Sequence, residues 1–374
     1  MPRFLLSGAL VAVIGLAACA DSEAQTTTTF QVPTSVATEA QQQAADLAAQ
    51  AERSLQEGFL DEAVLSADQA IALDPGTAVA FGVRASAQYF LGDLSSALAD
   101  YDQAIALEPD NASLYAARGT VRVDLGMLKG ALEDFSTALE LDTDLVTTHT
   151  DRGRLLMLLG RPADAFAEFD LGVELAPESV GVYVGRGDAN LLLGQLDAAE
   201  ADFTAAIGLG TINELQRVFD PGLARAYYGL GLVLFQRGSP AEAVANYDQA
   251  VVLHPSFARA FAARGNAKKA MGDLPGALDD LNRSIEIEAA EPNTYSIRGG
   301  ILLEMGELEA AVADFDRALD LNEAHVGALA GRGLALAALG DVEGARRDLR
   351  AALSLIVDPG LHQTIESVLA DLET

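Results

Sequence analysis

The side chains of this 374-residue chain that most readily bind metals or transfer protons are four histidines and one cysteine. His149, His254, His325 and His362 stand far apart, with no His-Glu-x-x-His pattern and no pair four residues apart, and we expect each to lie on the surface. Cys19 is the only cysteine, which excludes an intrachain disulfide and a cysteine-based metal cluster. Because no nucleophile, base and orienting group occur together, we expect neither enzymatic activity nor a metal or cofactor.

Phosphate-containing ligands are not expected either. Short Gly-x-Gly runs, such as Gly185 to Gly187 and Gly331 to Gly333, resemble phosphate loops only weakly and lie inside predicted helices. The net charge is −31, with 24 Lys and Arg against 55 Asp and Glu. A nucleic-acid backbone requires a basic surface, so a nucleic-acid partner is excluded.

The position of Cys19 points to the membrane. An apolar run from Phe4 to Ala18 is too short to span a bilayer but has the length of a signal peptide. The run ends in Leu16-Ala17-Ala18-Cys19, which resembles the lipobox of bacterial lipoproteins. This resemblance implies acylation of Cys19, and Ala20 in place of an aspartate implies the periplasmic face of the outer membrane.

The alternative is ordinary signal cleavage after Ala18-Cys19-Ala20, which would release a soluble periplasmic protein. In either case we expect residues 1–18 to be a signal peptide. Residues 19–43 begin with a polar, threonine-rich and aperiodic stretch, which predicts a flexible tether.

The rest of the chain repeats itself with a period of 34 residues. Five repeats run from 44 to 213, ten residues (214–223) are inserted, and four more repeats run from 224 to 359. Position 15 is glycine and position 20 is alanine in all nine repeats. Such a period predicts stacked copies of one small structural motif.

Each repeated position has a role in a pair of helices. Glycine at position 15 ends the first helix in the left-handed conformation, and small residues at positions 8 and 20 allow close approach of the two helices. Proline at position 32 stops the second helix in four repeats. A large side chain fills position 24 in eight repeats: Tyr101, Phe135, Phe169, Phe203, Tyr247, Leu281, Phe315 and Leu349.

These positions and the period resemble the tetratricopeptide repeat, although the tryptophan that the family usually carries at position 4 is absent. The resemblance implies an all-α fold, an α-solenoid in which nine helical hairpins form a right-handed superhelix. Residues 360–374 place Leu361, Ile365, Leu369 and Leu372 on one stripe, which predicts a capping helix and tail.

An arginine and an acidic residue vary together among the repeats. Position 7 is arginine and position 23 is acidic in the same seven repeats. The arginines are Arg84, Arg118, Arg152, Arg186, Arg264, Arg298 and Arg332, and both charges are missing in repeats one and six. We therefore expect structural ion pairs within each repeat rather than a ladder of ligand-binding arginines.

The resemblance implies that partners bind in a concave groove lined by the first helices, at positions 2, 5, 9 and 12. The lysine and asparagine set with which some co-chaperones hold a terminal carboxylate is absent. Repeats six and seven gather scarce cations and aromatic residues at these positions: Arg225, Tyr228, Phe235, Arg259, Asn266 and Lys269. They form a candidate partner-binding site, or alternatively the aromatic rings pack between helices.

The sequence favours a protein-binding scaffold or adaptor of the bacterial cell envelope, with protein or peptide partners and a membrane anchor at Cys19. The alternative is an obligate structural subunit of an envelope complex for secretion, cell-wall work or assembly. A role accessory to glycosyl transfer rests on family analogy alone.

Overall fold

A computed structural model describes residues 39–212, 221–355 and 359–372. These ranges form nineteen helices and contain no strand. The helices group into two compact units that divide between Leu193 and Gly194. The predicted signal peptide, Cys19 and most of the tether lie outside the described residues.

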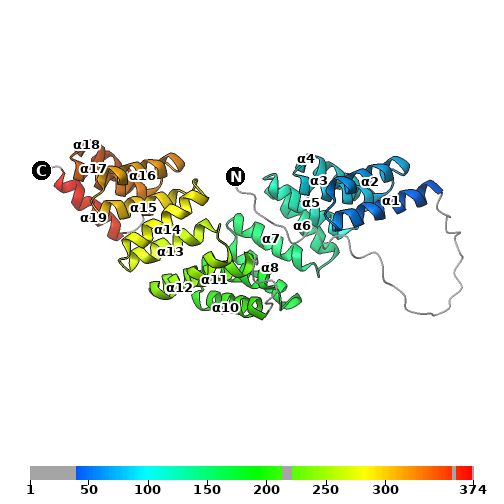
Figure 1. Cartoon of the computed structure of the whole chain (residues 1–374), viewed down its shortest axis with the longest axis horizontal. Helices are drawn as coiled ribbons and strands as arrows, with labels where there is room; N and C mark the ends of the chain where they lie inside the picture. The colour runs from blue at the N-terminus through cyan, green and yellow to red at the C-terminus, as the bar shows by residue number, and fades with distance from the viewer. Residues whose placement is uncertain (1–38, 213–220, 356–358, 373–374) are drawn as a thin grey trace. The chain divides into compact units, whose positions relative to one another are not determined.

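The first unit holds nine helices, which Figure 1 colours from blue to green. They are α1 (Glu39–Gln56), α2 (Leu60–Leu73), α3 (Ala78–Leu91), α4 (Leu94–Leu107), α5 (Ala112–Asp124), α6 (Leu128–Leu141), α7 (Val146–Leu158), α8 (Pro162–Leu175) and α9 (Val180–Leu192). Hairpins α1/α2 to α7/α8 are the first four repeats, and α9 is the first helix of the fifth.

The second unit holds the remaining helices. They are α10 (Leu196–Ile212), α11 (Pro221–Gln236), α12 (Pro240–Leu253), α13 (Ala258–Ala270), α14 (Leu274–Ile287), α15 (Pro292–Glu304), α16 (Leu308–Leu321), α17 (Val326–Leu339), α18 (Val342–Leu355) and α19 (Pro359–Asp371). Hairpins α11/α12 to α17/α18 are repeats six to nine, and α19 packs on α18 as the predicted capping helix.

The glycine at position 15 has its predicted role in every hairpin. Across the described residues, the glycines with positive φ are the nine glycines at this position. Gly92 is typical, with φ of 87°: its amide donates to the carbonyl of Tyr89, and the Asp93 amide donates to that of Gln88. These two bonds close the Schellman motif that ends α3 and turns the chain into α4.

The core is built around the large side chain at position 24. Phe169 is almost fully buried, and a Cβ added at Gly153 of its own repeat would lie 2.8 Å from the ring. A Cβ added at Gly185 of the next repeat would lie 2.4 Å from the same ring. Both distances are too short for an unstrained contact, so the glycines let two successive first helices close around one phenylalanine.

Three helix starts differ from the repeat boundaries. Helix α1 begins at Glu39, five residues before the first repeat, and its added residues are mostly exposed. Helices α11 and α19 begin at Pro221 and Pro359, inside the predicted insertion and at the end of repeat nine. Proline is favoured at the first position of a helix because the missing amide has no partner there.

Candidate protein-binding surfaces

The first helices of successive repeats contact one another within each unit. In the first unit α1, α3, α5, α7 and α9 follow in contact, and in the second unit α11, α13, α15 and α17 do the same. Second helices pack between the first helix of their own repeat and that of the next, as α2 does between α1 and α3 and α12 does between α11 and α13. The first helices therefore form a continuous inner surface in each unit, and the second helices form the outer surface.

The predicted ion pairs are present in the six repeats whose two charges lie in one unit. Arg84 donates from Nε and Nη2 to the two carboxylate oxygens of Asp100, both at 2.7 Å. The corresponding pairs are Arg118–Asp134, Arg152–Glu168, Arg264–Asp280, Arg298–Asp314 and Arg332–Asp348. Arg186 and Asp202 belong to different units, and their pairing stays a prediction.

Each of these arginines also contacts the preceding repeat, a contact that was not predicted from the sequence. Nη1 of Arg84 donates to Asp68 at 2.6 Å, sixteen residues upstream, and Nη1 of Arg118 donates to Asp102 at 2.7 Å. The same bond joins Arg186 to Asp170, Arg264 to Asp248, Arg298 to Asn282 and Arg332 to Asp316. The acceptor stands at position 25 in every case. The recurrence of a polar residue at this position could therefore have predicted the contact from the sequence.

The arginine at position 7 therefore forms hydrogen bonds with side chains of two successive repeats. In five repeats its guanidinium also lies over the aromatic ring three residues before it, for example 5.5 Å from the centroid of Phe81 in the case of Arg84. The hydrogen bond to Asp100 is the main cause that raises the pKa of Arg84. Where all of its donors are engaged in this way, the arginine holds neighbouring repeats together and does not present a cation to a ligand.

The candidate residues of repeats six and seven lie on α11 and α13, two adjacent first helices. Arg225 and Arg259 are exposed, and Asn266 is half-buried. Among the described residues, Arg259 has no hydrogen bond or ion pair. Lys269 pairs with Glu304 of α15, with Nζ and Oε1 2.8 Å apart.

The two aromatic candidates pack between helices, as the structural interpretation predicted. The Tyr228 ring centroid lies 5.0 Å from that of Phe257 and 6.0 Å from that of Tyr247. Phe235 packs on the core around Tyr247. These rings are partly buried between the helices, whereas the exposed Arg225 and Arg259 side chains lie on the inner surface.

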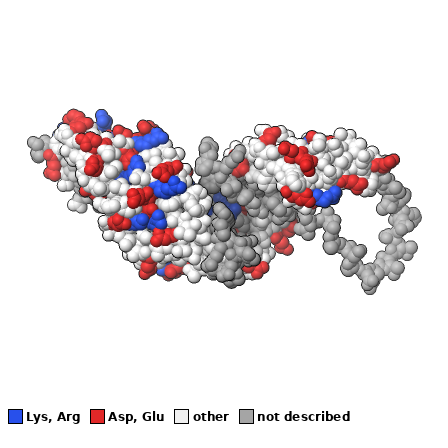
Figure 2. Space-filling model, in the orientation of Figure 1, with Lys and Arg blue, Asp and Glu red and all other residues white. Residues whose placement is uncertain are grey.

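The charged surface has no extended basic area on the face shown in Figure 2. There, the described Lys and Arg side chains of the second unit lie among Asp and Glu. Within the described ranges no group of His, Cys, Asp and Glu is arranged to hold a metal ion. No helix in the described part is long and apolar enough to cross a membrane.

An acidic group that was not predicted from the sequence lies inside the first unit. Asp151 of α7 is only 5% exposed, and burial raises its pKa to about 7 although Arg154 lies 3.5 Å away. Nearby, the Tyr89 hydroxyl of α3 donates to Asp124 of α5 at 2.8 Å. Asp151 stands at position 6, which is glycine, alanine, valine or isoleucine in the other repeats. An aspartate at this apolar position could have predicted a buried carboxyl group from the sequence.

The predicted surface histidine His149 is also buried. Nδ1 lies 2.8 Å from Glu168, and Nε2 lies 3.0 Å from the carbonyl oxygen of Thr143. Burial alone would raise the pKa of Glu168, but the hydrogen bonds from His149 and Arg152 outweigh it and lower that pKa. The prediction of an exposed side chain was wrong because this histidine takes the position of the aromatic ring in other repeats.

Comparison with known structures supports the fold. One chain of the APC/C hetero-tetramer Cut9–Hcn1 is 15% identical with a TM-score of 0.61, over 78% of this chain and 55% of that chain. This protein thus spans only about half the length of that relative. A tetratricopeptide repeat protein from Parabacteroides merdae is 22% identical with a TM-score of 0.53, over 66% of this chain and 94% of that chain. At these identities the likeness shows the fold alone.

No curated protein sequence matches this chain. Two family models described as tetratricopeptide repeats do match it. One covers residues 85–126 and 231–272, and the other covers 150–214 and 298–358, together more than half of the chain. With the hairpins, the left-handed glycines and the packed position 24 in place, the chain belongs to the tetratricopeptide repeat family.

Proposed function

We propose that this protein is a non-catalytic scaffold or adaptor of the bacterial cell envelope that binds a partner protein on the inner surface of its second unit. Arg259 carries the proposal. It is exposed on the inner surface and has no partner among the described residues, whereas the position-7 arginines are engaged in ion pairs. Arg259 of α13 and Tyr228 of α11 lie on adjacent first helices, and arginine and aromatic side chains are enriched at interface centres.

The place of action follows from the N-terminal sequence. The apolar run before Cys19 and the lipobox-like residues support export and acylation, with the outer membrane favoured by Ala20. Cys19→Ser should move the protein from the membrane fraction to the soluble fraction and abolish incorporation of a labelled fatty acid. Unchanged membrane association and labelling would disprove the lipid anchor.

The binding site is tested by charge reversal at matched positions. Arg259→Glu places an acid on the inner surface, and Arg283→Glu makes the same change on the outer helix of the same repeat. We expect affinity capture from solubilised membranes to lose its main partner with Arg259→Glu and to keep it with Arg283→Glu. If Arg259→Glu retained every partner, the inner-surface proposal would be rejected.

A second function, as an obligate structural subunit, is favoured by apolar side chains on the first unit. Leu158 of α7 and Leu192 of α9 stand at the same repeat position and are 60% and 65% exposed. A permanent partner would cover them. The mature chain with Cys19→Ser distinguishes the two functions, because an adaptor should purify as a folded soluble protein and an obligate subunit should aggregate alone.

A further inference from the structure

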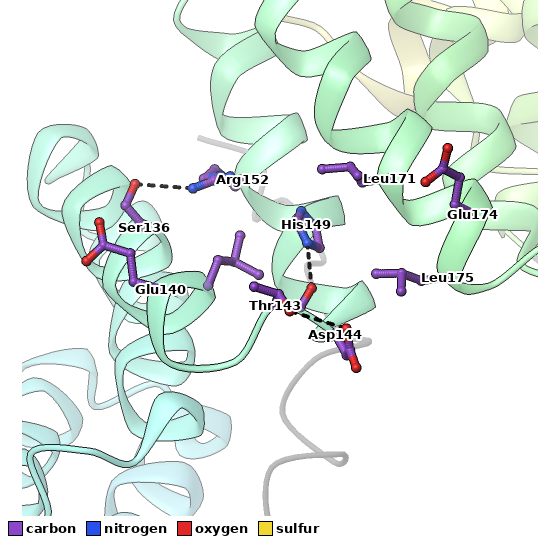
Figure 3. A pocket seen from close by; sticks show the side chains of 10 residues that line it. Ser136, Glu140, Thr143, Asp144, His149, Arg152, Leu171, Glu174 and Leu175 are labelled. Atoms are coloured by element: carbon purple, nitrogen blue, oxygen red, sulfur yellow. Dashed lines mark hydrogen bonds between the residues drawn. The ribbon is translucent and has the colours of Figure 1, made fainter.

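A pocket opens between repeats three and four, within the first unit. Its volume is about 570 Å³, which lies in the range of sites that bind small ligands or peptide side chains. It is lined by α6, by the loop that follows α6, and by α7 and α8 (Figure 3). Because two of these three helices are second helices, the pocket is separate from the inner surface of the proposed function.

The pocket lies where the hydrogen bond from the position-7 arginine to the preceding repeat is weakest. Position 25 is Ser136 here, and its Oγ lies 3.4 Å from Nη1 of Arg152, whereas the corresponding bonds to Asp68 and Asp102 measure 2.6 and 2.7 Å. Nε of Arg152 is buried and has no acceptor among the described residues. In repeat two, the Nε of Arg84 donates to an aspartate. The shorter serine thus leaves space and only a long contact at Nη1 of Arg152, while Nε lacks an acceptor because the second oxygen of Glu168 is bonded to His149.

His149 fixes the base of this pocket. It replaces the aromatic ring that lies beside the arginine in five other repeats. Both ring nitrogens face acceptors, Glu168 on one side and the Thr143 carbonyl on the other. The ring is therefore held in place, and the pocket beside it has a defined shape.

The rim of the pocket is acidic and its walls are apolar. Glu140 and Glu174 stand at the same position of repeats three and four and lie on opposite sides of the pocket in Figure 3. Both are exposed, and neither has a hydrogen bond or ion pair among the described residues. Leu139, Leu171 and Leu175 supply the walls. Long aliphatic stems with a charged end fit such surroundings.

We propose that this pocket binds a peptide segment of a partner protein through an arginine or lysine side chain. The aliphatic stem lies against the leucines, and the cationic end lies between Glu140 and Glu174. A backbone carbonyl of the segment can accept a hydrogen bond from Nη1 of Arg152, whose contact with Ser136 is long, at 3.4 Å. A metal ion would satisfy only the carboxylates and inorganic phosphate only the arginine, so a basic peptide fits both features best.

The proposal is tested with a fluorescein-labelled peptide, Gly-Gly-Arg-Ala-Ala-Arg-Gly-Gly, and the full mature chain at physiological salt. Fluorescence anisotropy measures the affinity of the peptide and of a copy with citrulline in place of arginine, which removes the charge and keeps the length and planar end of the side chain. The pocket variant is Glu140→Gln with Glu174→Gln. The control variant is Asp110→Asn with Glu178→Gln, which removes the same charge from two exposed carboxylates of the first unit that lie outside the pocket and have no ion pair among the described residues.

We expect the pocket variant to weaken binding about five- to tenfold and the control variant to weaken it less than about twofold. The citrulline peptide should bind at least about fivefold more weakly than the arginine peptide. Equal losses in the two variants would mean general attraction to an acidic chain and would overturn the proposal. Equal binding of the two peptides would overturn it as well, and neither result bears on Arg259.

Discussion

Replacing Asp151 by asparagine should stabilise the first unit at high pH and much less at low pH. The carboxyl group is buried in α7, and its pKa rises from 3.8 to about 7 on folding. The folded state therefore holds this proton more tightly than the unfolded state. Stability is highest while Asp151 is protonated and falls as the pH rises from about 4 to about 7.

The size of the effect follows from this pKa difference. Each pH unit inside the window corresponds to about 1.4 kcal/mol, so the penalty of the charged group grows by about 2 to 3 kcal/mol between about pH 5 and about pH 8. Asparagine keeps the shape of the side chain and removes the charge. The advantage of Asp151→Asn over the wild type should grow by this amount across the same pH interval.

Hydrogen exchange of the α7 amides measures this advantage locally, which matters because long repeat arrays do not always unfold in one step. Comparing variant and wild type at each pH cancels the intrinsic pH dependence of exchange. We expect the ratio of their protection factors to rise about thirtyfold or more from pH 5 to pH 8. Glu178→Gln, an exposed carboxyl of the same unit, is the control and should show no such rise. A constant ratio for Asp151→Asn would refute the reasoning.

Two further changes test the packing of the repeats. Asp280→Ala removes the acid that pairs with both Arg264 and Lys268, and it should cost about 3 kcal/mol in urea unfolding because it leaves poorly solvated charges. A loss below about 0.5 kcal/mol, as for an exposed pair, would contradict the structural role. Gly185→Ala places a methyl group against Phe169 and should cost about 1 to 3 kcal/mol. A more stable variant would show that this contact relaxes freely.

Much of the fold was predictable because the same physical constraints on turning and packing recur in all nine repeats. A glycine such as Gly92 had to adopt positive φ for the chain to turn, and Phe169 had to be buried between small residues. The charge pairs were predictable from their joint loss in two repeats. Contacts between successive repeats, such as Arg84 with Asp68, were harder to predict, because they depend on how one hairpin stacks on the next.

The candidate sites were predictable only in part. Lys269 was a candidate site residue, but its ammonium group pairs with Glu304, and that of the adjacent Lys268 pairs with a different acid, Asp280. The pocket beside His149 depends on one missing carboxylate at Ser136, a change that repeat averaging hides. The repeat pattern therefore predicted which helices form the inner surface. The effect of single residues that depart from the repeat, such as Ser136, could be understood only from the structure.

The most direct test of the scaffold function is a photo-crosslinker placed at Asn266, on the inner surface, and at Arg283, on the outer helix of the same repeat. Crosslinking in intact cells followed by mass spectrometry identifies what touches each position. We predict a partner protein attached at Asn266 and none at Arg283. The same adducts at both positions, or adducts at Arg283 alone, would contradict binding on the inner surface.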